Sequence, residues 1–283
     1  MARADHTNDT TATPHSDRTR RPRRARMMAP APAPDWAAWL RRWDRQQEVY
    51  LPEREERFAI MLDVVDALLA ETFVALDLAC GPGSLSHRLL SRFAHATCLA
   101  VDLDPVLLAL GQGALGDMQG RLRWIDADLR DPGWPARLDC APVDAVLSTT
   151  ALHWLPPDVL VRLYQQLGTL VRPGGLVLNG DHFPFGLQQP AFAPLVERMQ
   201  SRRAAGAPRA ADAEDWPAWW AALAHEPGLA PLFAERERRF AWRAGAEHEA
   251  LLDLHEAALR NAGFREVGTI WQHGNNRVLL AIR

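Results

Sequence analysis

Short apolar runs alternate with amphipathic segments through the middle of the chain. The runs that have the length and composition of β-strands are residues 73–79, 96–102, 121–128, 143–149 and 175–179. Between them, apolar positions recur at helical spacing over residues 85–93, from Pro105 onward and over residues 160–171. Repeated strand–helix units of this length predict an α/β fold, in which a parallel sheet is covered by helices on both faces.

Further elements are predicted on both sides of this alternating region. Apolar positions recur at spacings of three and four from Trp36 to Trp43, which predicts a helix, and a second helix is predicted from near Pro52 to Leu69. At the other end, a helix over residues 247–262 leads into a hairpin. The hairpin is formed by residues 264–271, the turn Gly274-Asn275-Asn276 and residues 277–282.

Two segments do not fit the alternation. Residues 1–34 are polar and then basic, end in an Ala-Pro repeat, and carry seven Arg and three Asp. This composition cannot form a core, so we expect a disordered tail. Residues 183–246 contain no regular strand–helix unit but hold four tryptophans, among them Trp216, Trp219 and Trp220. We interpret this second segment as an insert.

Composition and charge exclude several classes of function. The chain has 283 residues and a formal net charge of −3, which argues against a nucleic-acid partner. All 32 basic residues are Arg, so neither Schiff-base lysine chemistry nor a Walker A loop is available. Cys80, Cys98 and Cys140 form no CxxC pair, which predicts neither a disulfide framework nor a metal site. No apolar run approaches the ~20 residues that span a bilayer, and no secretory signal is visible. We therefore expect a cytoplasmic protein without a membrane partner.

Three carboxylates and a Gly-rich turn lie where successive strands are predicted to end. Residues 76–83 connect the first strand to a helix, and small residues there let a ligand approach the backbone and the helix N-terminus. Asp77 belongs to this segment, Asp102 ends the second strand 19 residues after Gly83, and Asp128 ends the third strand. Each Asp alone is explained by a helix cap or a turn. Together they favour a site for ribose hydroxyls at Asp102 and an adenine amino group at Asp128.

These segments occur in an order that is typical of one family. The matching pieces are residues 74–83, 100–105, 125–128, 143–154, 170–178 and 262–264. The sequence resembles the class I S-adenosylmethionine-dependent methyltransferases of the small-molecule type. The resemblance implies a Rossmann-like, doubly wound sheet of seven mostly parallel strands with a closing antiparallel hairpin and a helical lid insert. It divides the chain into a tail (1–34), a helical cap (35–72), a cofactor-binding core (73–182), a substrate lid (183–246) and a final helix with hairpin (247–283).

The resemblance also assigns cofactor contacts for S-adenosyl-L-methionine. It implies that the turn at Ala79, Gly81 and Gly83 lies under the methionine and ribose, and that Asp77 steers the methionine end. It further implies that Asp102 binds the ribose hydroxyls and that Asp128, with the backbone of Leu129, contacts the adenine edge. Ala79 stands where the fullest form of the family motif has Gly. We expect a slightly tighter turn there and a site that is retained.

Two alternative functions stay open beside methyl transfer. An NAD(P)-dependent oxidoreductase would need a Gly at Ser86 to complete its fingerprint, counted from Gly81. Ser86 and the predicted hairpin favour the methyltransferase. A protein that binds S-adenosylmethionine without catalysing a reaction is not excluded by the sequence.

The acceptor is predicted to be a small molecule. The segment Ser148-Thr149-Thr150-Ala151 differs from the Asn/Asp-Pro-Pro-aromatic run of enzymes that methylate adenine or amide nitrogen. Whether the acceptor atom is oxygen, nitrogen or carbon stays open, and a weak likeness to aconitate-type carboxyl methyltransferases keeps a carboxylate among the options. Tyr50, Trp219 and Trp220 are candidate substrate contacts, with helix packing as the alternative for each.

Two histidines are candidate general bases. His153 follows the fourth predicted strand and His182 follows the fifth, so both are expected at the edge of the sheet where the acceptor would bind. A neutral imidazole is a suitable base near pH 7. The alternative is that either ring only hydrogen-bonds the backbone at a turn. The sequence does not indicate an oligomeric state.

Overall fold

The computed structural model describes residues 34–51, 53–140, 142–206, 214–243 and 250–283. The predicted tail therefore lies outside the described residues except for Pro34. Parts of the predicted lid, residues 207–213 and 244–246, also lie outside them, as does the predicted start of the last helix.

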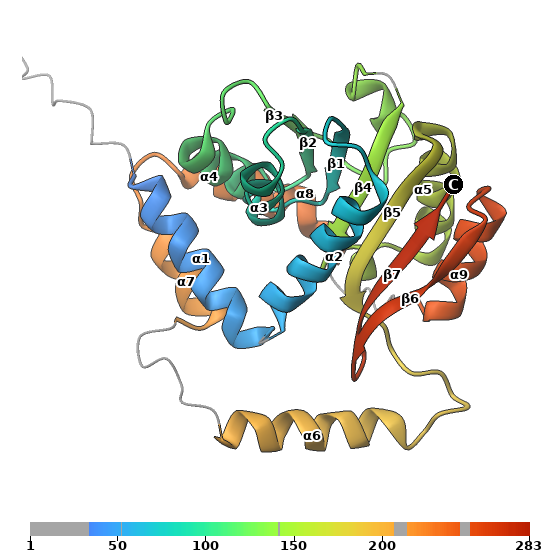
Figure 1. Cartoon of the computed structure of the whole chain (residues 1–283). Helices are drawn as coiled ribbons and strands as arrows, with labels where there is room; N and C mark the ends of the chain where they lie inside the picture. The colour runs from blue at the N-terminus through green and yellow to red at the C-terminus, as the bar shows by residue number, and fades with distance from the viewer. Residues whose placement is uncertain (1–33, 52, 141, 207–213, 244–249) are drawn as a thin grey trace, which may run out of the picture. The chain divides into compact units, whose positions relative to one another are not determined.

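One seven-stranded sheet organises the fold (Figure 1). The strands are β1 (Val74–Leu78), β2 (Thr97–Asp102), β3 (Leu122–Asp126), β4 (Val143–Thr149), β5 (Val171–His182), β6 (Glu266–His273) and β7 (Asn276–Ile282). Their order is β3-β2-β1-β4-β5-β7-β6. Strands β1 to β5 are mutually parallel, whereas β7 is antiparallel to both β5 and β6. The predicted fold class, including the closing hairpin, is confirmed.

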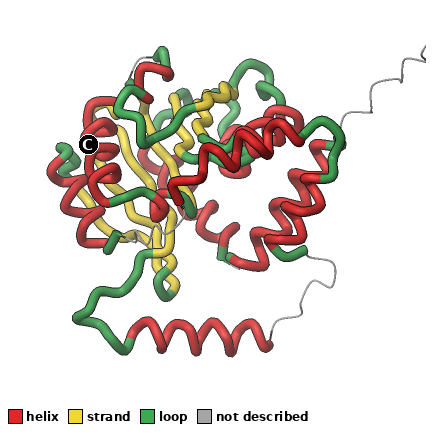
Figure 2. Tube along the Cα trace, turned by 180° about the vertical axis from the view of Figure 1, so that it is seen from behind, coloured by secondary structure: helices red, strands yellow, loops and turns green. Residues whose placement is uncertain are grey.

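Helices cover both faces of the sheet, as Figure 2 shows from behind. The α-helices are α1 (Trp36–Tyr50), α2 (Arg54–Leu68), α3 (Ser84–Arg92), α4 (Pro105–Leu115), α5 (Pro157–Leu170), α6 (Phe192–Gly206), α7 (Trp216–Ala224), α8 (Ala230–Phe240) and α9 (Leu252–Asn261). Alternate strand residues point to opposite faces. On β1, Ala75 belongs to the core cluster with α2 and α3, whereas Leu76 belongs to the cluster with α5 and α9.

The strand order reverses between β1 and β4. In an open α/β sheet, ligands bind outside the carboxyl ends of the strands at such a switch point. Helices α1, α4, α7 and α8 contact one another beside these carboxyl ends and share a third apolar cluster. Figure 1 shows α1 (blue) and α7 (orange) side by side, although they are far apart in sequence.

Three details differ from the sequence-based prediction. Strand β5 runs to His182, so this residue lies within the strand and not after it. The last helix begins at Leu252 and not at Glu247, because Leu251 is extended (φ −64°, ψ 152°). The insert contains α6, α7 and α8 and a short 3₁₀-helix, η3 (Ala241–Arg243). Among the described residues, no helix has both the length and the apolar character needed to cross a bilayer.

Candidate active site

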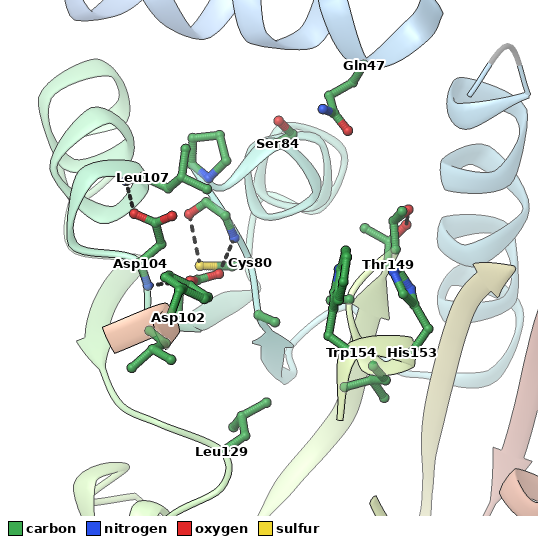
Figure 3. A pocket seen from close by; sticks show the side chains of 18 of the residues that line it. Gln47, Cys80, Ser84, Asp102, Asp104, Leu107, Leu129, Thr149, His153 and Trp154 are labelled. Carbon is green, nitrogen blue, oxygen red and sulfur yellow. Dashed lines mark hydrogen bonds between the residues drawn. The ribbon is translucent and has the colours of Figure 1, made fainter. Parts of the chain in front are cut away.

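One cavity lies at the carboxyl ends of the central strands and has a volume of about 410 Å³. We call it the main cavity because the segments that follow four strands meet in its wall. Its wall combines the segments after β1, β2, β3 and β4 with residues of α1, α7, α8 and η3. Figure 3 shows Asp102 and Asp104 on one side and Thr149, His153 and Trp154 across from them. A volume of this size is typical of pockets for small molecules and cofactors.

The Gly-rich turn is held from behind by Asp77. This carboxyl is 2% exposed, and its Oδ2 accepts hydrogen bonds from the backbone N (3.1 Å) and Oγ (2.6 Å) of Ser86 at the start of α3. Burial raises the pKa of Asp77 to about 7, against the effect of the Ser86 hydrogen bonds. Asp77 does not line the main cavity. Asp77 therefore positions the turn through its hydrogen bonds to Ser86.

The turn itself has left-handed backbone at three positions. Ala79 (φ 54°) and Gly81 (φ 56°) line the main cavity, whereas Gly83 (φ 80°) does not. A Cβ added at Gly83 would lie 2.5 Å from the ring of Trp124, so Gly83 is required for packing. Ala79 adopts the conformation that glycine adopts without strain. Position 79 thus has the left-handed backbone that favours glycine, although its residue is Ala.

Asp102 connects the Gly-rich turn to the end of β2. Its Oδ2 accepts from the backbone N of Gly81 and its Oδ1 from the backbone N of Asp104, both at 2.7 Å. Burial, followed by the nearby Asp104 carboxylate, raises the pKa of Asp102 to about 6. Each carboxylate oxygen can accept more than one hydrogen bond. Asp102 lines the main cavity and keeps the capacity to accept from two hydroxyl groups.

Asp128 and Leu129 line the same cavity beyond the end of β3. Both oxygens of Asp128 already interact with Arg130, since Oδ2 lies 2.6 Å from Nη2 and Oδ1 accepts from the backbone N at 2.9 Å. The Arg130 guanidinium in turn lies 4.2 Å from the centre of the Trp242 ring. The Asp128 carboxylate is therefore oriented by Arg130 at the edge of the cavity.

A second cavity of about 550 Å³ adjoins β4, β5 and α6. Thr150 and His153 line both cavities, and His182 lines the second one. The two predicted bases are thus brought to one cavity, as expected. Phe185 from the segment after β5 and Glu197 from α6 also line it. His153 lies on a wall that both cavities share, so its side chain can contact a ligand in either cavity.

His153 is paired with a buried carboxylate that the sequence analysis did not assign to it. Nδ1 of His153 lies 2.8 Å from Oδ1 of Asp181, which is 1% exposed. Burial alone would raise the pKa of Asp181, but attraction to His153, hydrogen bonds and the charge of Arg57 hold it below its usual value. Burial and the same Arg57 lower the pKa of His182. At neutral pH the site therefore holds an ionised Asp181 and a neutral His182.

The aromatic residues of the insert separate into two groups. Trp219 is fully buried, packs against Trp43 with ring centres 4.9 Å apart, and does not line the main cavity. Trp220 and Trp216 do line it. The Tyr50 hydroxyl, which also belongs to this wall, accepts a hydrogen bond from the backbone N of Trp216 at 2.8 Å. Of the three predicted substrate contacts, Trp219 alone is placed away from the cavity.

Helix α8 closes the cavity on the side of β2 and β3. Nε of Arg236 lies 2.6 Å from Oδ2 of Asp104, and Nη1 of Arg239 lies 2.5 Å from Oδ1 of Asp126. These ion pairs tie the insert to the ends of β2 and β3, where Asp102 lies. This part of the insert therefore covers the ribose and adenine region that the sequence predicts, and not the acceptor side alone.

Comparison with known proteins bears on the same region. Residues 75–175 match a family model described as a methyltransferase domain. The chain is 30% identical over 168 residues to a trans-aconitate 2-methyltransferase of Azoarcus sp. (strain BH72), covering 57% of this chain and 61% of the relative. It is 32% identical over 167 residues to one of Mycobacterium tuberculosis (strain ATCC 25177 / H37Ra), covering 57% of this chain and 55% of the relative. The matched part of the chain spans less than two thirds of either relative.

Solved structures share the fold of this chain. A magnesium protoporphyrin IX methyltransferase from Synechocystis PCC 6803 superposes with a TM-score of 0.52 at 14% identity, covering 87% of this chain and 95% of that chain. An O-methyltransferase family protein from Burkholderia thailandensis has a TM-score of 0.50 at 18% identity, covering 87% and 69%. The first of these structures contains S-adenosylhomocysteine. These likenesses agree with the fold predicted from the sequence.

Several residues of the candidate site were missed by sequence reasoning. The missed residues are Arg57, Asp104, Thr149, Thr150, Trp154, Asp181 and Arg243. Asp181 had a detectable signal, because the pairing of neighbouring β4 and β5 brings the end of β5 beside the segment after β4. Arg57 had none, since it lies on a helix outside the family motifs. No group of three or more His, Cys, Asp or Glu among the described residues is arranged to hold a metal ion.

Proposed function

We propose that this methyltransferase transfers a methyl group from S-adenosylmethionine to a hydroxyl oxygen of a small-molecule acceptor, with His153 as the general base. The observation that carries the proposal is the pairing of His153 Nδ1 with the buried Asp181 on a wall shared by two cavities. The cofactor occupies the main cavity and the acceptor occupies the second one.

The main cavity fits the cofactor in three respects. Asp102 offers two partly satisfied carboxylate oxygens to ribose hydroxyls. The left-handed backbone at Ala79 and Gly81 brings the main chain to the cavity wall. The side chain of Leu129 supplies apolar surface beside Asp128 for a purine ring. When bound, S-adenosylmethionine supplies an electrophilic methyl group, whose bond to sulfur breaks with the electron pair left on sulfur.

The residues of the chain supply proton removal and orientation. Asp181 accepts a hydrogen bond from Nδ1–H of His153, which leaves Nε2 as the basic nitrogen. Nε2 takes the proton of the acceptor hydroxyl as the oxygen forms its bond to the methyl carbon. Much of the remaining barrier is lowered by holding the two reactants in line, which needs no further catalytic group.

A carboxylate acceptor is the second candidate, because the two curated relatives are trans-aconitate methyltransferases. Arg54, Arg130 and Arg236 of the main cavity wall each have a carboxylate partner. Among the described residues, Arg243 has none, and its guanidinium lies 4.5 Å from the centre of the Trp154 ring. A guanidinium in this position can bind a carboxylate. A carboxylate is already ionised at neutral pH and needs no base.

An acceptor screen separates the two candidates. Formation of S-adenosylhomocysteine is measured with trans-aconitate and with a panel of phenols and alcohols, for the wild type, His153→Gln and His182→Gln. A hydroxyl acceptor requires that His153→Gln lowers kcat by about 10²–10⁴-fold. Equal rates for wild type and His153→Gln with trans-aconitate would establish the carboxylate reaction and remove the base. Cofactor binding with no turnover on any acceptor would leave a non-catalytic binding protein.

We further propose a cytoplasmic location, no nucleic-acid partner, and the division into cap, core, lid and final hairpin given above. Free Cys80, Cys98 and Cys140 and the net charge of −3 support the first two. Cell fractionation and a mobility-shift measurement with duplex DNA test them. Limited proteolysis tests the division, since cleavage should concentrate between the proposed segments.

A further inference from the structure

A fully buried arginine lies behind the proposed reaction centre. Arg57 of α2 has an exposed fraction of 0%. Its Nη1 donates to Oδ1 of Asn276 on β7 at 2.9 Å, and its Nη2 donates to Oγ1 of Thr149 at 2.7 Å and also to Oγ1 of Thr150. Burial lowers the pKa of Arg57 to about 10, so the guanidinium stays charged at neutral pH. A buried charge that links three elements is costly unless it has a function or full pairing.

The hydroxyl groups that Arg57 holds belong to a strained turn. Thr150 has a φ of 54°, which is rare for a β-branched residue. Its backbone N donates to the carbonyl of Gly180 at 2.9 Å, and Thr149 and Thr150 both line the main cavity. Such strain persists only where the surroundings enforce it, and it concentrates at functional sites. Arg57 Nη2 donates to both hydroxyl groups, which themselves lie 3.4 Å apart, and these side-chain contacts hold the turn.

Arg57 also acts on the charge of His182. The charged and titratable groups in this neighbourhood are Asp181 and His182 on β5, His153 after β4, His255 on α9, Tyr164 on α5, Glu197 on α6, Glu53 before α2, Arg54 on α2, His273 paired with Glu53, and Arg243 beside Trp154. Burial and the positive charge of Arg57 lower the pKa of His182, whereas the negative charges of Asp181 and Glu53 raise it.

We propose that Arg57 is a positioning residue for methyl transfer, which fixes the Thr149–Thr150 turn through its hydrogen bonds and holds its positive charge near His182. This inference rests on the proposed role of His153, which follows the same turn, as the base. It assigns to α2, which lies outside the matched methyltransferase domain, a part in holding the reaction centre.

Histidine titration tests the charge without an acceptor. In protein labelled with ¹⁵N-histidine and saturated with S-adenosylhomocysteine, the ring signals of His182 are followed by NMR from pH 5 to 9 and assigned with His182→Gln. Arg57→Gln should raise the titration midpoint of His182 by about one pH unit, the scale of a nearby charge. Arg57→Lys should keep it close to the wild type. An unchanged midpoint in Arg57→Gln would overturn the inference.

One control variant excludes a merely structural role. Arg121→Met removes a partly buried arginine that donates to the backbone carbonyls of Leu90 and Phe93 at the end of α3, away from the carboxyl ends of the strands, and should leave the His182 midpoint unchanged. If Arg57→Gln does not fold, the guanidinium signals of Arg57 in the wild type are measured in its place. They should shift with the titration of His182, and a pH-independent Arg57 would overturn the inference.

The hydrogen-bonding role has its own readout. With an acceptor from the screen above, Arg57→Lys should lower kcat by about tenfold or more, because the planar fork to two hydroxyls is lost, while the Kd for S-adenosylhomocysteine stays within a few-fold. An unchanged kcat would remove this role. A His182 titration midpoint that moves as expected in a protein without methyl transfer would refute the proposed function and leave the Arg57 charge effect established.

Discussion

Nδ1 of His153 and Oδ1 of Asp181 lie 2.8 Å apart, although 28 residues separate them in the sequence. The other oxygen of Asp181 accepts from the backbone N of His153 at 3.2 Å, and Oδ1 also accepts from the backbone N of His182 at 2.8 Å. One buried carboxylate thus fixes both the ring and the backbone of His153. The imidazole is held in one tautomer, with Nε2 left as the free nitrogen.

Replacing this carboxylate tests the pair directly. Asp181→Asn keeps the size of the side chain but removes the charge that stabilises a protonated His153. With a hydroxyl acceptor, we expect kcat to fall by about 10²-fold, within the range of base catalysis, and the Kd for S-adenosylhomocysteine to stay unchanged. Single-turnover rates and calorimetry measure the two quantities. Asp144→Asn, which breaks the Asp144–Arg172 ion pair at the start of β4, is the matched control. Equal rates for both variants would show that Asp181 is only structural.

The sheet could be predicted from the sequence because each strand carries its own local signal. The apolar runs, the Gly-rich turn after β1 and the Gly274 turn of the hairpin each report a single element, and the order of β1 to β5 follows from short right-handed connections. The Asp181–His153 contact, by contrast, has no local signal in the sequence. It depends on the register between β4 and β5, which includes an irregularity between Val143 and Ala145. A shift of one residue would turn Asp181 to the opposite face.

Asp102 should make cofactor affinity depend on pH. Its folded pKa is raised to about 6 by burial and by Asp104, so the carboxylate becomes protonated as pH falls through about 6. A neutral carboxyl accepts hydrogen bonds from ribose hydroxyls more weakly than a carboxylate. We expect the Kd for S-adenosylhomocysteine to be constant above pH 7 and to rise about tenfold toward pH 5, by loss of a charge-assisted hydrogen bond.

Calorimetry at several pH values measures this effect, and Asp102→Asn supplies the comparison. The variant should bind ten- to a hundredfold more weakly at pH 8, as expected for about 1.5–3 kcal/mol, and should show no further loss toward pH 5. If the Kd of the wild type and that of Asp102→Asn depended on pH in the same way, Asp102 would not be the ribose contact.

Helix α8 should control release of the cofactor product. Arg236 and Arg239 tie it to Asp104 and Asp126 on the cofactor side. We expect Arg236→Gln with Arg239→Gln to raise the dissociation rate of S-adenosylhomocysteine by about tenfold, since each partly buried ion pair contributes of the order of 1 kcal/mol. Stopped-flow fluorescence measures the rate. Arg238→Gln is the control, because Arg238 pairs with Glu235 on the same helix. An unchanged dissociation rate in the double variant would show that the ion pairs of α8 do not control product release.

Trp219 and Trp220 should respond differently to substitution although they are adjacent. Trp219 is fully buried against Trp43, so Trp219→Ala should lower the free energy of unfolding by about 3–5 kcal/mol. Trp220 lines the main cavity beneath Arg236, with 3.9 Å between the guanidinium and the ring centre. Trp220→Ala should cost less stability and weaken ligand binding. Urea unfolding and calorimetry check both, and the reverse order of effects would contradict this division.

The division between these tryptophans could not be predicted from the sequence. Both lie in the insert at apolar positions, and a one-residue step on a helix turns a side chain by about 100°. Which of the two faces the core is decided by α1 and α4, which supply the facing residues of the third apolar cluster. The same holds for the surroundings of Asp128, because its neighbour and partner Arg130 lies against Trp242, which is far from both in the sequence.

Asp77 should make stability depend on pH in the direction opposite to that of a salt-bridged acid. Burial raises its pKa from 3.8 to about 7, so the native state binds the proton more tightly than the unfolded chain does. The contribution of Asp77 to the free energy of unfolding is fully present below about pH 4 and is lost as pH rises through about 7, at about 1.4 kcal/mol for each unit of pKa shift.

Asp77→Asn cannot ionise, and its amide oxygen can still accept from Ser86. Between pH 5 and 8, urea unfolding should therefore show the wild type losing free energy of unfolding relative to Asp77→Asn, with the exposed Asp131→Asn as the control for loss of one acid. Parallel curves for wild type and Asp77→Asn would mean that Asp77 stays ionised, and that its role in positioning the Gly-rich turn is carried by a charged carboxylate.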